Sequence, residues 1–300
     1  MSIKSRDIEQ AIVKVNNNCF RLKNSYGKPG GLLDLSSIDK PVIVIGDLHG
    51  SIENLKAILD HNKNRKEIRN GNTILVIIGD GMHNDQIGHM MEMESSLEVF
   101  EELIKLICSY GNSVLYLKGN HDSFEERLAK SAIKQGLEFK LHLLKHRGED
   151  YVKAADNFFE SLPFFIIGKG YVITHAGPIR NGATRQEIID IDDNPDYQHQ
   201  LMWNRLHEFR GNPNLKEYGE SDIRKMLERF KLPPDTPFIV GHNPMWQTGN
   251  KTGIWRDIIG IKNHIIIYSN IGTCGPYLKI NNETIDECFA ISKKSEQYYV

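Results

Sequence analysis

The sequence is poor in several features that define large classes of protein. Its 300 residues include only four cysteines, none of them in a Cys-x-x-Cys pair, which favours reduced thiols in a cytosolic protein. No apolar run approaches the ~20 residues that a membrane helix needs. The first residues, Met1 to Arg6, also lack the apolar core of a signal peptide. We therefore expect a cytoplasmic protein with no membrane partner.

Strong charge of either sign is also missing. Thirty-seven Lys and Arg residues nearly balance 39 Asp and Glu residues, for a formal net charge of −2. No basic stripe with interleaved aromatic residues is present, which argues against a nucleic-acid platform. Hydrophobic residues make up 40% of the chain, enough for one sizeable core. Length alone allows two domains, but the polar motifs described next must converge on one centre, so we expect a single domain over residues 1–300.

Five polar motifs follow short apolar runs. The runs at 42–45, 74–78 and 114–117 are rich in β-branched residues and predict buried strands. Ligand sites in open α/β sheets lie past the carboxyl ends of strands, so we expect the polar side chains along one edge of a sheet. The motifs are Gly46-Asp47-Leu48-His49-Gly50, Gly79-Asp80, Gly119-Asn120-His121-Asp122, Thr174-His175-Ala176-Gly177 and Gly241-His242-Asn243.

The donors in these motifs suit a pair of divalent metal ions. Carboxylate oxygen and imidazole nitrogen bind Zn, Fe and Mn, and the absence of thiolate argues against a structural zinc site. Two ions about 3.5–4 Å apart can hold both the attacking and the leaving oxygen of an in-line displacement. Asp80 has two oxygens and can bridge them. Any one motif alone is commonly a turn or loop, but the five together predict hydrolysis of a phosphate ester.

In their order these motifs resemble the calcineurin-like metallophosphoesterases, and within them the bacterial branch of the phosphoprotein phosphatase family. The resemblance runs from about position 41 to about position 245. It implies an α/β fold in which two mixed β-sheets pack as a sandwich flanked by helices. It also implies a dinuclear metal site at the carboxyl ends of the strands, and direct attack of metal-bound hydroxide on phosphorus.

The resemblance also implies a role for each motif residue. The first metal would be held by Asp47 and His49, and Asp80 would bridge both ions. Two divalent ions are implied, with Mn favoured and Fe or Zn as alternatives. By the same resemblance, the second metal would be held by Asn120, His175 and His242. His121 would act as the general acid. Arg205, in the segment Leu201-Met202-Trp203-Asn204-Arg205, would bind the phosphate.

One segment departs from the family pattern. After Gly-Asp the family has x-x-Asp-Arg, whereas this chain has Gly81-Met82-His83-Asn84. The family aspartate orients the general acid and its arginine binds phosphate. His83 is a candidate for the orienting role, with Asp85 and Asp122 as alternatives, and Asn84 occupies the position of the substrate-binding arginine. The loss of that arginine is expected to weaken capture of a dianionic monoester.

Three functions are compatible with these motifs and with the one departure from the family pattern. The leading one is a phosphate monoesterase similar to protein serine/threonine phosphatases, acting on a phosphorylated protein or a small phosphate ester. The alternative is a hydrolase of nucleotides, dinucleoside polyphosphates or phosphodiesters, in which Trp203 or Trp246 stacks on a base. A non-catalytic metal-bound binding protein is the third, supported only by the missing Asp-Arg pair.

The remaining apolar patterns predict the surrounding elements. Residues 1–40 are expected to form an N-terminal helical extension with a loop at 27–31, and residues 123–162 a helical cap or a packing layer on the sheet. Further helices are predicted at 52–59, 97–107 and 220–231. A hairpin is predicted over 164–174, and late antiparallel strands of a second sheet at 265–268, 277–280 and 287–291.

Overall fold

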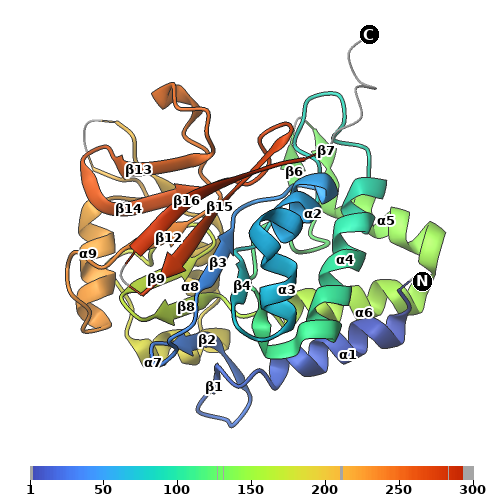
Figure 1. Ribbon diagram of the computed structural model, residues 1–300, viewed down its shortest axis with the longest axis horizontal. Helices are drawn as coiled ribbons and strands as arrows, with labels where there is room; N and C mark the ends of the chain where they lie inside the picture. The colour runs from blue at the N-terminus through green and yellow to red at the C-terminus, as the bar shows by residue number, and fades with distance from the viewer. Residues whose placement is uncertain (1–2, 127, 131, 210–211, 283, 293–300) are drawn as a thin grey trace.

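The computed structural model describes residues 3–126, 128–130, 132–209, 212–282 and 284–292. Two mixed β-sheets lie face to face, and helices cover their outer faces (Figure 1). This arrangement confirms the predicted α/β sandwich. None of the described helices combines the length and the apolar character that crossing a membrane requires.

The first sheet has five strands and carries the first three polar motifs. Strands β3, β4 and β5 pair in parallel, as the strand-helix alternation predicts. Strand β15 pairs antiparallel with the free side of β3, and β16 pairs antiparallel with β15. In spatial order the strands are β16 (Thr284–Ile291), β15 (Cys274–Asn281), β3 (Val42–Ile45), β4 (Ile74–Ile77) and β5 (Val114–Tyr116).

The second sheet has seven strands and carries the last two motifs. The predicted hairpin is present as the antiparallel pair β8 and β9. Strand β12 lies between β9 and β14 and is parallel to both. In spatial order the strands are β1 (Arg21–Lys23), β2 (Pro29–Leu35), β8 (Phe165–Gly168), β9 (Tyr171–Thr174), β12 (Phe238–Val240), β14 (Ile261–Ile267) and β13 (Ile254–Ile258).

The prediction that the late strands share one sheet is wrong. Strand β14 belongs to the seven-stranded sheet, whereas β15 and β16 complete the five-stranded one. A crossing from one sheet to the other therefore occurs between Ile267 and Cys274. The hydrophobic pattern of the sequence identifies each strand but does not show which strand it pairs with. Both β3 and β12 had a free side on which a late strand could pair.

The loop predicted at 27–31 is also only partly correct. Gly27 lies in the turn, but Pro29 already begins β2, which pairs with β8. Gly30 and Gly31 lie in this strand with no room for a side chain, because a Cβ would lie 2.6 Å from the Ile189 and Ile188 carbonyl oxygens respectively. The predicted N-terminal extension over residues 1–40 thus contains one helix, and its strands β1 and β2 belong to the seven-stranded sheet.

The core between the sheets follows from the alternation of side chains along each strand. In β3, Val42 and Val44 face the seven-stranded sheet, where they join a buried cluster with Ile173 and Ile239. The intervening residue Ile43 faces the opposite way, into a cluster lined by the outer helices. Both faces of β3 are therefore buried, which explains its continuous apolar run.

Helices cover the two outer faces in separate groups (Figure 1). The helices α1 to α6 contribute to the core against the five-stranded sheet, and α7 to α9 contribute to the core against the seven-stranded sheet. The α-helices are α1 (Ser5–Asn16), α2 (Ile52–Asp60), α3 (Asn64–Arg69), α4 (Glu94–Tyr110), α5 (Gln135–Arg147), α6 (Glu149–Glu160), α7 (Arg185–Ile189), α8 (Pro195–Trp203) and α9 (Glu220–Arg229).

Short elements complete the chain. Two-stranded pairs form between β6 (Ala129–Lys130) and β7 (Ile133–Lys134), and between β10 (Arg205–Leu206) and β11 (Glu217–Tyr218). The 3-10 helices are η1 (His61–Lys63), η2 (Gly111–Ser113), η3 (Ile191–Asp193) and η4 (Trp246–Thr248).

The described part of segment 123–162 divides into two roles. Helices α5 and α6 bury apolar side chains such as Phe139 and Phe158 in the core beside α4, which is a packing layer. Leu128, Ala129 and Gln135 instead line the cleft described below. The cap therefore stays a prediction, and these three residues are the described part of the segment that lies at the cleft.

Candidate metal centre

The polar motifs meet where the two sheets adjoin. Asp47, Asp80 and Asn120 follow β3, β4 and β5 of one sheet, while His175 and His242 follow β9 and β12 of the other. The sequence predicted one edge of one sheet, but these candidate ligands follow the strand ends of two sheets packed face to face. A bridge between Asp47 and Tyr268 joins the sheets at this point.

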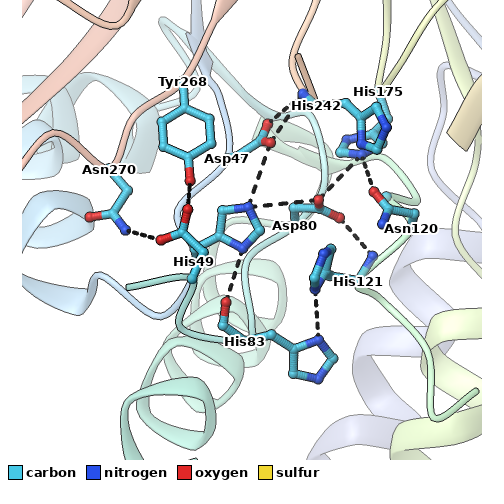
Figure 2. Close-up of polar contacts among 12 residues, drawn as sticks. Asp47, His49, Asp80, His83, Asn120, His121, His175, His242, Tyr268 and Asn270 are labelled. Carbon is cyan, nitrogen blue, oxygen red and sulfur yellow. Dashed lines mark hydrogen bonds and ion pairs between the residues drawn. The ribbon is translucent and has the colours of Figure 1, made fainter. Parts of the chain in front are cut away.

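Two groups of potential ligand atoms share one carboxylate. Asp80 lies within 4.8 Å of donor atoms of His49 and His121, and in a second group within the same distance of His175 and His242. An aspartate that belongs to both groups is positioned to bridge two cations. Figure 2 shows Asp80 between His49 and His175, with a dashed line to each.

Hydrogen bonds fix which nitrogen of each histidine faces this centre. His175 Nδ1 lies 2.8 Å from the Ile78 carbonyl oxygen and must donate to it. In neutral His175 the lone pair on Nε2 then points at oxygens of Asn120, 3.0 Å away, and Asp80, 3.4 Å away. Facing lone pairs repel, so either a proton on Nε2 or a bound cation among these atoms would stabilise the arrangement.

His49 has the same arrangement. Its Nδ1 lies 3.0 Å from the His83 carbonyl oxygen and donates to it, so Nε2 faces Asp47 at 3.8 Å and Asp80 at 4.0 Å. Orientation of ligand histidines by backbone carbonyls is typical of metal centres. His242 Nε2 is buried and has no hydrogen-bond partner among the described residues. These three imidazoles fit a metal centre by the chemistry of their donor atoms.

The buried charged groups also fit a metal centre. Asp47 and Asp80 are each 1% exposed. Burial, with a further contribution from the Asp80 carboxylate, raises the pKa of Asp47 to about 6. Burial alone would lower the pKa of His175, but the carboxylates of Asp80 and Asp47 outweigh it and raise that pKa to about 9. The pocket favours positive charge, which two divalent ions supply in place of protons.

The backbone around the centre is strained where it turns toward the ligands. His49, Asp80 and His242 have φ angles of 43°, 52° and 59°, a left-handed conformation that costs a non-glycine residue of order 1–3 kcal/mol. Neighbouring glycines allow close approach: a Cβ on Gly119 would collide with the Asp80 carboxylate, and one on Gly241 with the Asp47 carboxylate. The chain thus accepts strain to direct these side chains inward.

His121 lies between the centre and His83. Its backbone N–H donates to Asp80 Oδ1 at 2.8 Å, and its ring Nδ1 lies 3.1 Å from His83 Nδ1 (Figure 2). His83 is fully buried and packs against Phe139. Burial, together with the neighbouring His121, keeps the pKa of His83 well below its ordinary value. Of the three partners considered for His121, His83 is in hydrogen-bond contact with its ring.

The other two candidates have well-defined partners elsewhere. Asp122 is fully buried and accepts hydrogen bonds from the backbone N–H groups of Asp80 and Gly119, at 3.1 and 2.8 Å, and from Tyr116 Oη at 2.6 Å. It therefore joins the loops that follow β4 and β5. Asp85 accepts from the Tyr268 hydroxyl.

A cleft of about 360 Å³ opens onto the centre. Its lining includes His49, Asp80, Asn120, His121 and His242, together with Arg205, whose binding of phosphate stays a prediction. Asn84 is not among the described lining residues. Its side-chain oxygen accepts from the Gln86 N–H, and its carbonyl accepts from Gln135.

Several cleft residues were missed in the sequence. Tyr268, Gln135 and Pro244 also form its walls. Tyr268 directly follows strand β14, as the candidate metal ligands follow their own strands. The rule that site residues lie just past strand ends could therefore have identified Tyr268 too. Gln135 carries no such signal, because only the tertiary contact with the loop after β4 brings it to the cleft.

Comparison with known proteins agrees with this geometry. Residues 40–260 match the calcineurin-like phosphoesterase family. No curated protein matches the sequence. A serine/threonine phosphatase of Saccharomyces cerevisiae with similarity to human phosphatase PP5 has a similar structure, with a TM-score of 0.71 at 16% identity. That similarity covers 98% of this chain and 90% of the other.

Two more distant structures share the fold. One was provisionally described as a diadenosine tetraphosphatase, with a TM-score of 0.51, 15% identity, and coverage of 87% of this chain and 98% of the other. The second is a cold-active protein-tyrosine phosphatase of a psychrophilic Shewanella species, with a TM-score of 0.53, 14% identity, and coverage of 88% and 82%. Because the family match spans most of the chain, the protein belongs to the calcineurin-like phosphoesterases and is a metal-dependent phosphoesterase.

Proposed function

We propose that the protein hydrolyses phosphate monoesters and that its natural substrates are phosphorylated proteins. One observation carries this proposal. Two groups of potential metal ligands share Asp80, and they lie in the same cleft as one positively charged side chain, Arg205. Arg205 is the one Lys or Arg among the described residues that line the cleft. One guanidinium matches one phosphoryl group, because its planar fork binds two phosphate oxygens at once.

We propose the following ligands for the centre. Asp47 and His49 would hold one divalent ion, Asp80 would contact both ions, and Asn120, His175 and His242 would hold the second. Bound Mn²⁺ would lower the pKa of a coordinated water and offset the charge of the phosphoryl oxygens. The buried carboxylates and the oriented imidazoles support this ligand set.

The chain's own residues supply the remaining steps. Arg205 binds and orients the phosphoryl group. His121 protonates the leaving oxygen from Nε2, since its Nδ1 faces His83. His83 holds the His121 ring in that orientation. His121 also lies close enough to His49 and Asp80 to act as a ligand, so the assignment as general acid is tested through metal content below.

A second candidate function is hydrolysis of nucleotides or phosphodiesters. It is favoured by Asn84 at the position of a family arginine, and by Trp203, which lines the cleft and offers an aromatic face. Against it, a polyphosphate chain would place further negative charge in a cleft that Asp85 also lines. A phosphate monoester therefore fits the described lining better than a polyphosphate does.

The test compares an aryl phosphate monoester with the matching bis-aryl diester, using chelator-stripped protein with and without added Mn²⁺. We expect Mn²⁺ to restore turnover, mainly on the monoester. A preference for the diester would replace the first function with the second. Serine-, threonine- and tyrosine-phosphorylated peptides then test the protein-substrate assignment.

A further inference from the structure

Two histidines lie one helical turn apart on α5. The rings of His142 and His146 are neighbours, with centroids 4.4 Å apart and planes 35° apart. Two histidines four positions apart on a helix share one face and can bind a single zinc ion together. Neither residue is among the described residues that line the cleft, and no step of the proposed hydrolysis uses them.

A carboxylate from a neighbouring helix lies beside this pair. Glu94 is the first residue of α4, and its Oε2 atom lies 3.2 Å from His142 Nε2. Two donors bound to one tetrahedral zinc ion at about 2.0–2.1 Å lie about 3.3–3.4 Å apart. The observed spacing is therefore close to that of two ligands of one ion. Two histidines and one glutamate are also a ligand set that zinc enzymes use, with water at the fourth position.

His142 Nε2 has no hydrogen bond of ordinary geometry. The atom is buried, and none of the described residues is its hydrogen-bond partner, although the Glu94 oxygen is only 3.2 Å away. The two atoms thus lie side by side rather than pointing at each other, as two ligands around one cation do. A buried polar atom without a partner is unfavourable, and a bound metal ion would supply the missing partner.

The surroundings of the pair permit a cation. Partial burial, with a further contribution from His146, lowers the pKa of His142 below its ordinary value of 6.5. The ring is therefore neutral at pH 7, which is the form that binds metal. The neighbouring Arg147 is paired with Glu101 at 3.0 Å, which offsets its charge. His146 is exposed, so its ring can rotate to bring a nitrogen to the other two donors.

We propose that His142, His146 and Glu94 form a zinc-binding site that is separate from the phosphoesterase centre and joins α4 to α5. The expected ligands are two imidazoles, one carboxylate and a water molecule. Phe139, one turn before His142, packs against His83, so the ion would fix the helix that supports the His83 ring. Folding brings Glu94 to α5, so zinc binds the folded chain in preference to the unfolded chain and is expected to stabilise it.

The experiment measures the zinc content of the full-length protein by elemental analysis after equilibrium dialysis against a zinc buffer at pH 7. Differences between variants carry the result, so it does not depend on how many ions the phosphoesterase centre holds. We expect His142→Gln combined with His146→Gln to bind one zinc ion fewer than the unmodified protein. Glu94→Gln changes only an exposed side chain and is expected to require more free zinc to fill the same site.

His89→Gln is the matched control. His89 is also exposed and lies 3.5 Å from a carboxylate, that of Glu92, so this pair supplies one imidazole and one carboxylate. The zinc content of this variant is expected to equal that of the unmodified protein. Zinc is also expected to raise the melting temperature of the unmodified protein more than that of the double variant. Equal zinc content in the double variant and the unmodified protein would overturn the proposal. An equal loss in His89→Gln would also overturn it, because it would identify ordinary surface binding.

Discussion

The Nδ1 atoms of His83 and His121 lie 3.1 Å apart, with His83 fully buried behind His121. One of the two atoms must donate to the other. When His83 donates, His121 carries its own proton on Nε2, the nitrogen that remains for the cleft. A histidine thus occupies the orienting place that an aspartate has in the family pattern.

Replacement of His83 is expected to slow turnover without loss of metal. His83→Leu removes the contact with His121 but keeps the backbone carbonyl that accepts from His49. We expect kcat to fall by about tenfold or more, within the range for a general acid that is no longer oriented. His83→Asn retains a polar atom near the Nδ1 position and is expected to recover part of the rate. Equal rates in both variants and the unmodified protein would remove His83 from the mechanism.

Replacement of His121 separates a general acid from a ligand. In His121→Asn we expect kcat on alkyl phosphates to fall by about 10²–10⁴-fold. A smaller loss is expected on aryl phosphates, whose leaving group departs without a proton. Metal content, measured by elemental analysis after gel filtration, is expected to stay at the unmodified level. Loss of one metal ion would identify His121 as a ligand, as its distance to Asp80 permits.

Replacement of Arg205 tests the phosphate clamp. Arg205→Lys keeps the charge but loses the planar fork, and Arg205→Ala loses both. We expect kcat/KM on an aryl phosphate to fall by about tenfold in Lys and further in Ala, since charge-assisted hydrogen bonds contribute about 1.5–3 kcal/mol. The affinity for inorganic phosphate as an inhibitor is expected to fall in parallel. Unchanged inhibition by phosphate would place the arginine outside the binding site.

Replacement of Asp122 tests how firmly the loop that carries Asp80 is held in place. Asp122→Ala leaves two buried backbone N–H groups, of Asp80 and Gly119, without their acceptor, at about 1–3 kcal/mol for each unsatisfied group. We expect a lower melting temperature and weaker Mn²⁺ binding by titration calorimetry. Asp122→Asn keeps a carbonyl oxygen as acceptor and is expected to lie between the two. Full Mn²⁺ affinity in Asp122→Ala would show that the loop holds its shape without this carboxylate.

The sequence located the proposed metal ligands because each stands directly after a strand of clear pattern. The rule that parallel strands end at one edge then placed Asp47, Asp80 and Asn120 together. It failed to show that His175 and His242 approach from a different sheet, because strand pattern carries no pairing information. The same gap explains β14, which the sequence assigned to one sheet with β15, although the chain crosses between sheets there.

Residues that act through tertiary contact were harder to predict. Gln135 begins α5 and reaches the loop after β4 through its side-chain amide, 2.7 Å from the Asn84 carbonyl. No local pattern marks such a residue. Asn84 shows the converse case, since its register in the motif predicted a role in substrate binding, whereas its side chain accepts from the Gln86 N–H in its own loop.

The last prediction concerns stability rather than activity. His264 is fully buried, its Nδ1 donates to the Phe238 carbonyl at 3.0 Å, and its Nε2 accepts from the Tyr218 hydroxyl at 2.9 Å. Burial, only partly opposed by the Phe238 hydrogen bond, lowers the pKa of His264 to about 4 from an ordinary value of 6.5. Neutral His264 is thus matched to its partners, and protonation would convert Nε2 into a donor facing a hydroxyl.

The sign follows from proton uptake. Between pH 6.5 and about 4 the unfolded chain binds a proton at His264 that the folded protein does not, so the free energy of unfolding falls as the pH falls. A pKa difference of this size corresponds to about 3 kcal/mol at full effect. The measurement is urea unfolding of the unmodified protein and of His264→Gln at several pH values from 7 to 4.5, which gives the free energy of unfolding of each protein as a function of pH. We expect the variant to be less stable at pH 7 but to lose less stability on acidification, because it lacks the titrating group. Parallel pH curves for the two proteins would show that His264 does not cause the acid sensitivity.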